Sequence, residues 1–488
     1  MKKILALFLA ALTVAGAAAC GGGKGPAETS GAVSESEKTE DMFASLSEYD
    51  GYKNGLGGET YLILNSKIPT IEDGNGLDFE GEISDDGAIP SAIYRRTVAV
   101  EDRFEVDVDH VATETLVEDI YEMTQSGDAD YQAIYGVYSN MATVAMAGEL
   151  MNLRDLPCIN YGAEWWNASA QENLTVGGNQ YFAINDIAYT TLMSTHCMFF
   201  NLKLAEDYRA KVGNPYEYVE NGTWTLDRLL QTSKGVSLDN GDSVWDETDQ
   251  YGLALSIGSS TMFGVSFGES VYPVKIVNGE VAEVDEIKWA DIVSRLYTLF
   301  YDNDNGTYVG EHLSSTATSI FVNGGALYYV GALCEAPSYF RDMTDDFGVL
   351  PMPKYDEKQK DYRTPLSGGS AVFGTSRLHF NSDNTFIGFV TEALAIASGR
   401  YIRSAVYETV FENQITRDEE SKKTLEIIEN SIFADFVFLH AGGINGYYGE
   451  IHMLLGQKMD QYASMRKRYK TKVEGYYRDV IESYHNIA

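Results

Sequence analysis

The chain has 488 residues, of which 36 are Lys or Arg and 72 are Asp or Glu, and its formal net charge is −36. This acidic balance argues against a nucleic-acid-binding role and against direct binding to an anionic membrane surface, because like charges repel. The length, with 44% hydrophobic residues, is enough for more than one packed domain.

The first twenty residues have the order of an export signal. Two lysines precede an apolar run from Ile4 to Val14, and small residues then lead to Cys20. This order is typical of a cleaved signal peptide, and the run is too short for a membrane-spanning helix. The ending AAAC resembles the lipobox of bacterial lipoproteins, although Ala17 stands where leucine is usual. We therefore expect removal of residues 1–19, a lipid on Cys20, and an extracytoplasmic protein anchored to the cell membrane. An ordinary secreted protein is the alternative.

Residues 20–57 begin with a stretch that is rich in Gly, Ser and Glu and has almost no apolar residue to bury. Such a composition is typical of a flexible tether and not of a domain.

Strand and helix patterns alternate after the tether. Short apolar or alternating runs at 59–65, 105–111 and 131–137 predict strands. The helix after Pro90 and the helix ended by Gly127 fall between them, and another helix, 141–150, follows. The order β-α-β-α-β-α predicts a mainly parallel, doubly wound sheet.

The remaining chain continues this α/β pattern. The segment 180–201 suggests two extended runs, and Thr223 or Thr225 opens a helix. The predicted elements beyond these are a helix at 289–300, a strand at 347–353, and an apolar helix at 385–399 ended by Gly399.

Several of these pieces, in this order, resemble the large extracellular solute-binding family that includes maltose-binding protein. The matching segments are the lipobox-like start, D-x-D-Y-Q-A-I at 128–134, GELMNLRDLP at 148–157, the segment 180–201, NGTWTLDRLL at 221–230, IFVNGGALYYVG at 320–331, DDFGVLPMPK at 345–354, and RYIRSAVYETV and TRDEESKKTLEII near the C-terminus. The set covers nearly the whole mature chain.

The resemblance implies a two-lobe clamp, in which two α/β lobes with flanking helices are joined by hinge strands and close on a ligand. Lobe 1 would comprise 58–186 and 367–410, and lobe 2 would comprise 187–366 and 411–488. The chain would cross near Ala183–Tyr189, Thr364–Phe373 and Thr409–Arg417. A membrane permease of an ATP-binding-cassette importer would recognise the closed form, and a monomer without a cofactor is expected.

A carbohydrate is the expected ligand, since sugar rings pack on aromatic faces and their hydroxyls need several donors and acceptors. Ligands of open α/β sheets bind beyond the carboxyl ends of the strands. Candidate contacts on that edge are Asn65, Ser66, Lys67, Tyr135, Tyr138, Ser139 and Asn140, and further candidates, Trp166 and Tyr447, lie in an aromatic and a glycine-rich segment. The resemblance also implies contacts from Ser259, Ser260 and Phe263, which are similar to the loop by which the second lobe closes on its ligand.

Other functions and sites have less support. A peptide or polyamine is an alternative ligand, and a lipid-anchored glycoside hydrolase is an alternative of another class, but no catalytic motif supports an enzyme. The stretch 238–249 brings acids together as a calcium loop does, but its spacing departs from that of a calcium loop. Calcium binding there is therefore the less favoured interpretation. Cys158, Cys197 and Cys334 allow either one disulfide and a free thiol or three free thiols.

Overall fold

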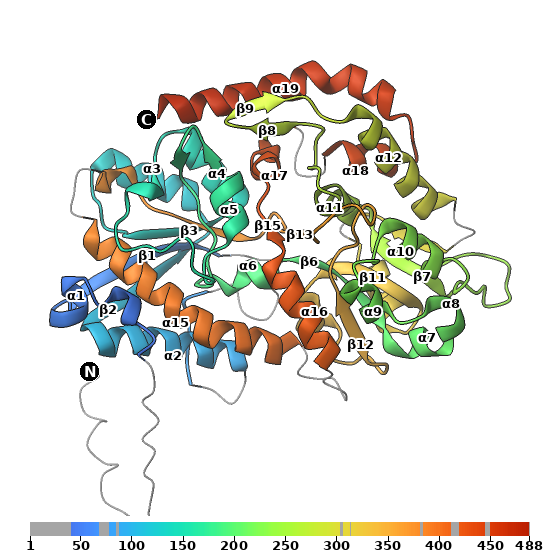
Figure 1. Cartoon of the computed structure of the whole chain (residues 1–488), viewed down its shortest axis with the longest axis horizontal. Coiled ribbons are helices and arrows are strands. Elements are labelled where there is room, and N and C mark those ends of the chain that lie inside the picture. The colour runs from blue at the N-terminus through green and yellow to red at the C-terminus, as the bar shows by residue number, and fades with distance from the viewer. Residues whose placement is uncertain are drawn as a thin grey trace, which may run out of the picture. The chain divides into compact units, whose positions relative to one another are not determined.

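Two sheets with helices packed on both faces form the core of the described chain, as Figure 1 shows. This computed structural model describes residues 41–67, 78–83, 87–302, 306–312, 314–380, 384–410, 419–444 and 449–487. The chain from Met42 onward is one compact unit. The expected α/β class is confirmed.

The first sheet has the strand order β14-β3-β1-β2. Its strands are β1 (Glu59–Ser66), β2 (Val106–Thr113), β3 (Ala133–Val137) and β14 (Ala371–Gly374). β1 pairs in parallel with both β2 and β3, as the β-α-β-α-β order predicts, and β14 pairs antiparallel to β3. Gly127 ends α3 (Leu116–Ser126) as expected, because its φ of 80° is left-handed and its N–H reaches the carbonyl of Met123.

Alternate side chains of the first sheet enter two different cores. Tyr61 and Ile63 of β1 pack with Tyr135 in the core that α2 (Ala88–Phe104) and α15 (Thr385–Val410) cover. Leu64 and Ile134 point to the other face, into the core that includes α3 and α4 (Tyr138–Met146). The period of two in these strands therefore produces a sheet with helices on both faces.

The second sheet has the order β10-β7-β11-β6-β12. Its strands are β6 (His196–Asn201), β7 (Tyr251–Ser256), β10 (Thr307–Gly310), β11 (Ala326–Ala332) and β12 (Phe347–Leu350). β7 pairs in parallel with β10 and β11, whereas β6 is antiparallel to β11 and β12. Phe199 and Phe200 enter the two cores on opposite faces.

Three two-stranded ribbons complete the strands. They are β4 (Thr175–Val176) with β5 (Asn179–Gln180), β8 (Lys275–Val277) with β9 (Glu280–Ala282), and β13 (Thr364–Pro365) with β15 (Ile432–Phe433).

The helices vary from one turn to seven. They are α1 (Asp50–Asn54), α2 (Ala88–Phe104), α3 (Leu116–Ser126), α4 (Tyr138–Met146), α5 (Ala168–Asn173), α6 (Tyr189–Met193), α7 (Leu202–Asp207), α8 (Arg209–Val212), α9 (Pro215–Glu220), α10 (Leu226–Ser233), α11 (Ser260–Ser266), α12 (Glu286–Tyr301), α13 (Thr316–Val322), α14 (Glu335–Tyr339), α15 (Thr385–Val410), α16 (Glu419–Asn430), α17 (Phe436–Leu439), α18 (Gly449–Gly456) and α19 (Tyr462–Asn486). Within the described ranges, no helix is both long and apolar enough to span a membrane.

Thr225, one of the two expected caps, accepts a hydrogen bond from the N–H of Arg228 and opens α10.

Two chain segments run side by side from one sheet to the other. Ala183 pairs with Phe373, which lies on β14, and Thr195 pairs with Leu366 farther along. The chain therefore passes from the first sheet to the second and later returns along the same path, as the resemblance implies. Most of the third expected crossing, Thr409–Arg417, lies outside the described residues.

Two sequence-based element predictions are wrong. Gly399 does not end the apolar helix, because α15 continues to Val410. The buried side chains Ile402 and Val406 extend its apolar face, and the missing Cβ of Gly399 lets α15 approach Trp165. The run 180–201 is also not two extended segments, since Tyr189–Met193 forms helix α6 before β6 begins. The buried Asp78 fixes that helix by accepting bonds from the N–H and hydroxyl of Thr190.

Helix α19 contacts elements that border both sheets, and Figure 1 shows it running across the top of the view. Near its start, Tyr462 stacks on Trp289 of α12, and near its end Tyr484 packs on Tyr181.

The strands of each sheet all come from one of the two expected lobe ranges. The lobe boundaries, and the placing of 411–488 in lobe 2, remain predictions.

Candidate functional site at the carboxyl edge of the first sheet

The carboxyl ends of β1 and β3 bring polar side chains together. β1 and β3 lie side by side in parallel, with Asn65 opposite Tyr135. β14 runs the other way, and its first residue, Ala371, lies opposite Val137 at the end of β3. Ser370, directly before β14, is therefore at the same edge as Ser66 and Tyr138.

These polar groups are buried and have free hydrogen-bonding capacity. Asn65, Ser66, Tyr138 and Ser370 have 2%, 6%, 0% and 0% of their surface exposed. The two amide atoms of Asn65, the hydroxyls of both serines and the Tyr138 hydroxyl have no hydrogen-bond partner among the described residues. Leaving such a group unsatisfied costs about 1–3 kcal/mol, so buried polar groups normally bond to protein, water or ligand. All of them are uncharged, and together they can both donate and accept.

A groove of about 500 Å³ begins at Ser139, the residue after Tyr138, although none of the four unpaired residues lines it. Ser139, Thr143 and Met146 of α4 line one part of it, and Leu439, His440 and Tyr476 line the other. His440 is buried and keeps its Nδ1 without a partner in the described chain, while its Nε2 meets the Tyr484 hydroxyl at 2.9 Å. Burial lowers the His440 pKa to about 3, so this imidazole is neutral. The groove thus has the size of a ligand site and mixed polar and aromatic walls.

A second groove of about 740 Å³ lies between the loop that follows β1 and helix α14. Phe79 and His110 line the groove from the first-sheet side, Pro337 lines it from α14, and Arg341 lines it from just beyond the end of that helix. The sequence patterns did not single out this groove, because its lining residues come from segments that are far apart in the chain.

Several expected ligand contacts lie at or near this edge. Asn65 and Tyr138 are among the unpaired groups, and Ser139 and Asn140 follow on α4, half-buried. Lys67 is partly exposed and lies 3.6 Å from Glu114. Contact of any of these residues with a ligand remains a prediction.

Three expected aromatic contacts are packed inside the protein. The Tyr135 ring has Phe79 and Phe373 at centroid distances of 5.1 and 5.4 Å, and its hydroxyl bonds to Asn185. The Trp166 indole donates to Glu392 at 2.8 Å. Phe263 is fully buried against Phe267 and Phe300. In this geometry the three rings pack in the protein interior, and any stacking on a ligand stays a prediction.

The other expected contacts fall elsewhere. Ser259 precedes α11, at the carboxyl end of β7 in the second sheet, and is half-buried beside the unpaired, buried hydroxyl of Ser260. Tyr447 and the expected lipidation site Cys20 lie outside the described residues. Ser66 and Ser260 were expected together with Asn65 and Ser259, whereas Ser370 was not predicted from the sequence.

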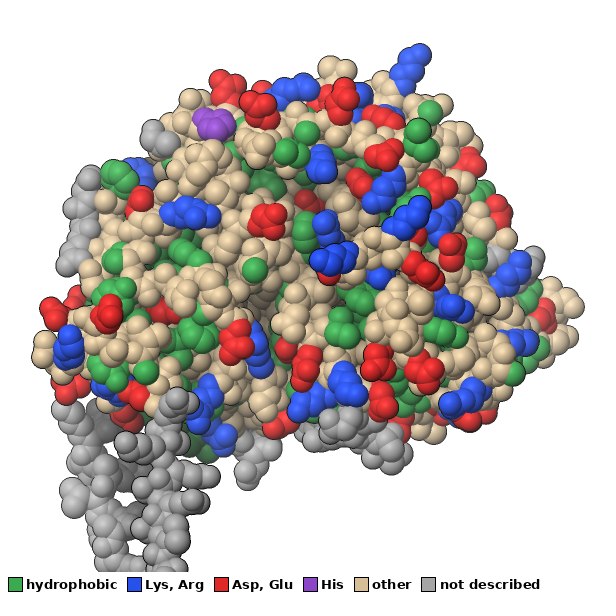
Figure 2. Space-filling model, viewed as in Figure 1, with side chains coloured by type: hydrophobic (Ala, Val, Ile, Leu, Met, Phe, Trp, Pro, Cys, Tyr) green, Lys and Arg blue, Asp and Glu red, His purple; other side chains and the backbone are tan. Residues whose placement is uncertain are grey.

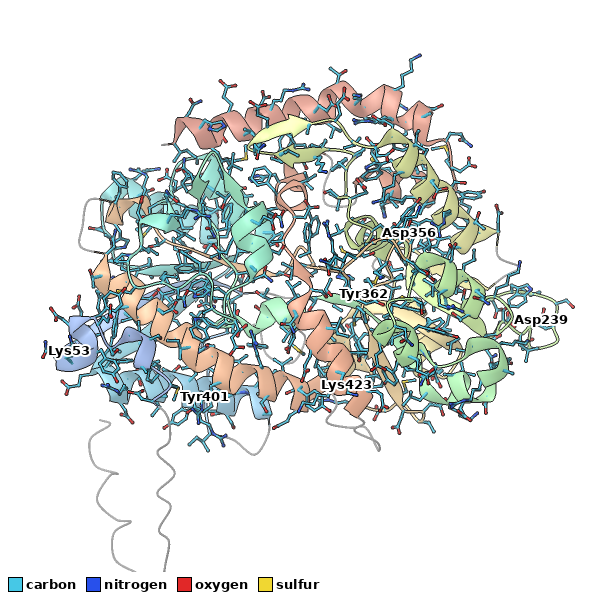
Figure 3. The ribbon with its side chains drawn as sticks, in the orientation of Figure 1. Lys53, Asp239, Asp356, Tyr362, Tyr401 and Lys423 are labelled. Carbon is cyan, nitrogen blue, oxygen red and sulfur yellow. The ribbon has the colours of Figure 1, made fainter. Side chains whose placement is uncertain are left out.

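Carboxylates of the acidic segment 238–249 accept hydrogen bonds from the backbone of the same segment. Asp239 accepts bonds from the N–H groups of Gly241 and Ser243, and Asp249 accepts from those of Asn240 and Asp246. Figure 3 shows Asp239 at the outer end of the second-sheet half. In the described part of the chain no His, Cys, Asp and Glu residues gather in a way that could hold a metal ion, and no disulfide joins Cys158, Cys197 or Cys334 there.

Charged side chains are spread over the surface and do not form a patch of one sign on the face in view. Figure 2 shows Lys and Arg side chains interleaved with Asp and Glu across that face. The large negative charge of the chain is therefore not concentrated there into one acidic surface.

No protein-family model matches the chain, and no curated protein matches it significantly. Solved structures do match. A cyclo/maltodextrin-binding protein in complex with maltotetraose has a TM-score of 0.52 at 13% identity, covering 88% of this chain and 97% of that chain. The cyclic α-maltosyl-1,6-maltose-binding protein of Arthrobacter globiformis also has 0.52, at 12% identity and coverages of 88% and 99%. A sugar transporter protein of Rhizobium etli in an open conformation has 0.51, at 13% identity and coverages of 87% and 99%. The chain therefore has the two-lobe α/β fold of the maltose-binding-protein-like solute-binding proteins.

Proposed function

We propose that this protein captures a carbohydrate outside the cytoplasm and delivers it to the permease of an ATP-binding-cassette importer. In this proposal it performs no chemistry on the ligand, and a lipid on Cys20 holds it at the cell membrane. The observation that carries the choice of ligand is the set of uncharged, buried and unpaired groups on Asn65, Ser66, Tyr138 and Ser370.

The chemistry of that edge favours a sugar over a peptide or a polyamine. Each sugar hydroxyl donates one hydrogen bond and accepts others, and amide and hydroxyl side chains match both roles. An ammonium or carboxylate group of a peptide or polyamine would need an opposite charge when it is buried. The unpaired atoms at this edge carry no charge, so a neutral polyol suits them better.

The paired crossing segments supply a hinge for this function. Rotation at the Ala183–Phe373 and Thr195–Leu366 pairings would bring the edge of the first sheet and the β7 end of the second sheet together around the ligand. In this proposal the lobes have the boundaries expected from the sequence, 58–186 with 367–410 and 187–366 with 411–488.

The test is titration calorimetry of the chain from Met42 onward, the compact unit, with maltotetraose and other oligosaccharides. Tetraglycine and spermidine serve as controls. Asn65→Ala should weaken oligosaccharide binding, whereas Asn323→Ala, an exposed position at the end of α13, should leave it unchanged.

Two other outcomes would each overturn one part of the proposal. Binding of tetraglycine or spermidine alone would refute the ligand class and keep the importer role. Release of shorter sugars during the titration, checked by chromatography, would refute the non-enzymatic role.

A further inference from the structure

A separate cavity lies beside the crossing segment and has charged walls that the proposed function does not use. Its volume is about 240 Å³, and it is lined by residues of the 162–168 loop, the crossing segment 184–192, helix α15 and the end of α16. Figure 3 shows Tyr401 on α15 and Lys423 on α16, the two helices whose neighbouring residues form one side of the cavity.

Acidic groups outnumber basic groups in this cavity. Glu164, Asp186 and Glu429 face a single guanidinium, that of Arg403. Arg403 is already engaged, because its Nε donates to Asp186 at 2.8 Å and its Nη2 donates to the Glu164 carbonyl. Within the described chain, the Glu429 carboxyl has neither a hydrogen bond nor an ion pair.

Burial disfavours the charged form of two of these acids, and Arg403 offsets this effect only in part. Burial raises the pKa of Glu429 to about 7, and Arg403 only partly offsets the effect of burial and of Asp186. Burial likewise raises the pKa of Asp186 to about 6, against the opposite influence of Arg403. A second positive group in the cavity would stabilise both carboxylates.

The rest of the wall is apolar and aromatic. Ile184, Leu192, Ile402 and Ile432 line it, and so does Trp166, whose position is fixed by the bond to Glu392. An indole is the aromatic group that attracts cations most strongly, and aliphatic side chains favour an alkyl body. The volume is below the range of drug-sized pockets, so the occupant is small.

We propose that this cavity binds a small organic cation, with its ammonium group at Glu429 beside Asp186 and a short alkyl body against Ile184, Ile402 and Trp166. The site is distinct from the carboxyl edge of the first sheet, where the unpaired groups are neutral. It would therefore bind its own ligand whether or not the edge binds a sugar.

The experiment is calorimetric titration of the full mature chain with isopentylammonium chloride at pH 8, with neutral 3-methyl-1-butanol as the matched uncharged probe. The alcohol should bind at least about tenfold more weakly than the amine. Glu429→Gln should weaken the amine by about tenfold or more, whereas Glu426→Gln, an exposed acid on the same helix, should change it less than about twofold. Near pH 6.5, titrations in two buffers of different ionisation heat should show proton release, since the amine favours the ionised Glu429.

Ala168→Leu provides a test that leaves every charge in place. Ala168 lines the cavity and is exposed, so a larger side chain narrows the space without disturbing the core. Amine affinity should fall in this variant too, while circular dichroism shows an unchanged fold.

Three results would overturn the proposal. The first is the absence of amine binding, and the second is full amine affinity in Ala168→Leu. The third is an equal loss of amine affinity in Glu429→Gln and Glu426→Gln, which would mean general attraction to an acidic protein. No sugar takes part in these titrations, so their failure leaves the proposed carbohydrate function untouched, and the reverse also holds.

Discussion

Replacing Glu450 with glutamine should stabilise the protein above pH 7 and have little effect below pH 4.5. Glu450 is 1% exposed at the start of α18, and neither carboxylate oxygen has a hydrogen-bond partner in the described chain. Burial raises its pKa from 4.5 to about 7, although the nearby Arg466 lowers it.

The sign of the effect follows from proton binding. Between pH 4.5 and 7 the folded protein keeps the Glu450 proton while the unfolded chain has lost it, so the free energy of unfolding falls as pH rises through this window. A shift of this size corresponds to about 3 kcal/mol lost above pH 7, at about 1.4 kcal/mol for each pKa unit. Glutamine has no proton to lose and should avoid this loss.

The measurement is urea unfolding of the wild type and Glu450→Gln from pH 4 to pH 8, with Glu482→Gln, an exposed acid on α19, as the control. The difference in unfolding free energy between Glu450→Gln and the wild type should grow with pH. Parallel curves would show that Glu450 ionises normally in the folded protein, and the reasoning from burial would fail.

Three further predictions address the site and the anchor. Asn65→Ala should weaken oligosaccharide binding by about 1–3 kcal/mol in calorimetry, because an amide that bonds the ligand is lost. An unchanged affinity would remove Asn65 from the site. Tyr135→Ala should destabilise the fold by about 3–5 kcal/mol in urea unfolding, since its buried ring packs on Phe79 and Phe373; a stable variant with weak sugar binding would instead make Tyr135 a ligand contact. Cys20→Ser should release the protein from the membrane fraction of cells, and continued retention would contradict lipidation at Cys20.

Local patterns were enough for many of the elements. The apolar run at 59–65 and the alternating run at 105–111 correspond to β1 and β2 because one side of each strand must reach a core. Trp289, Ile292 and Leu296 recur at helical spacing and form the buried face of α12. Thr225 caps the start of α10 and Gly127 ends α3, as the chemistry of these residue types predicts.

Other features depended on contacts between distant segments. A glycine often ends a helix, but Gly399 lies where α15 approaches Trp165, so close packing overrides the local signal. Tyr189–Met193 is helical because Asp78, more than a hundred residues earlier, bonds to Thr190. Sequence spacing carries no information about such partners.

The sequence by itself determined the α/β class, the strand order that leads to a parallel sheet, and the edge on which polar groups gather, because all three follow from local periodicity and chain direction. Only the tertiary structure decided which aromatic rings are exposed and which acids share a cavity. The sequence predicts Tyr135 and Trp166 as ligand contacts; the structure packs Tyr135 beside Phe79 and Phe373 and bonds the Trp166 indole to Glu392, and their contact with a ligand stays a prediction. The acids at the crossing segment came together for the same reason, since burial is a property of the whole packed chain and not of any single segment.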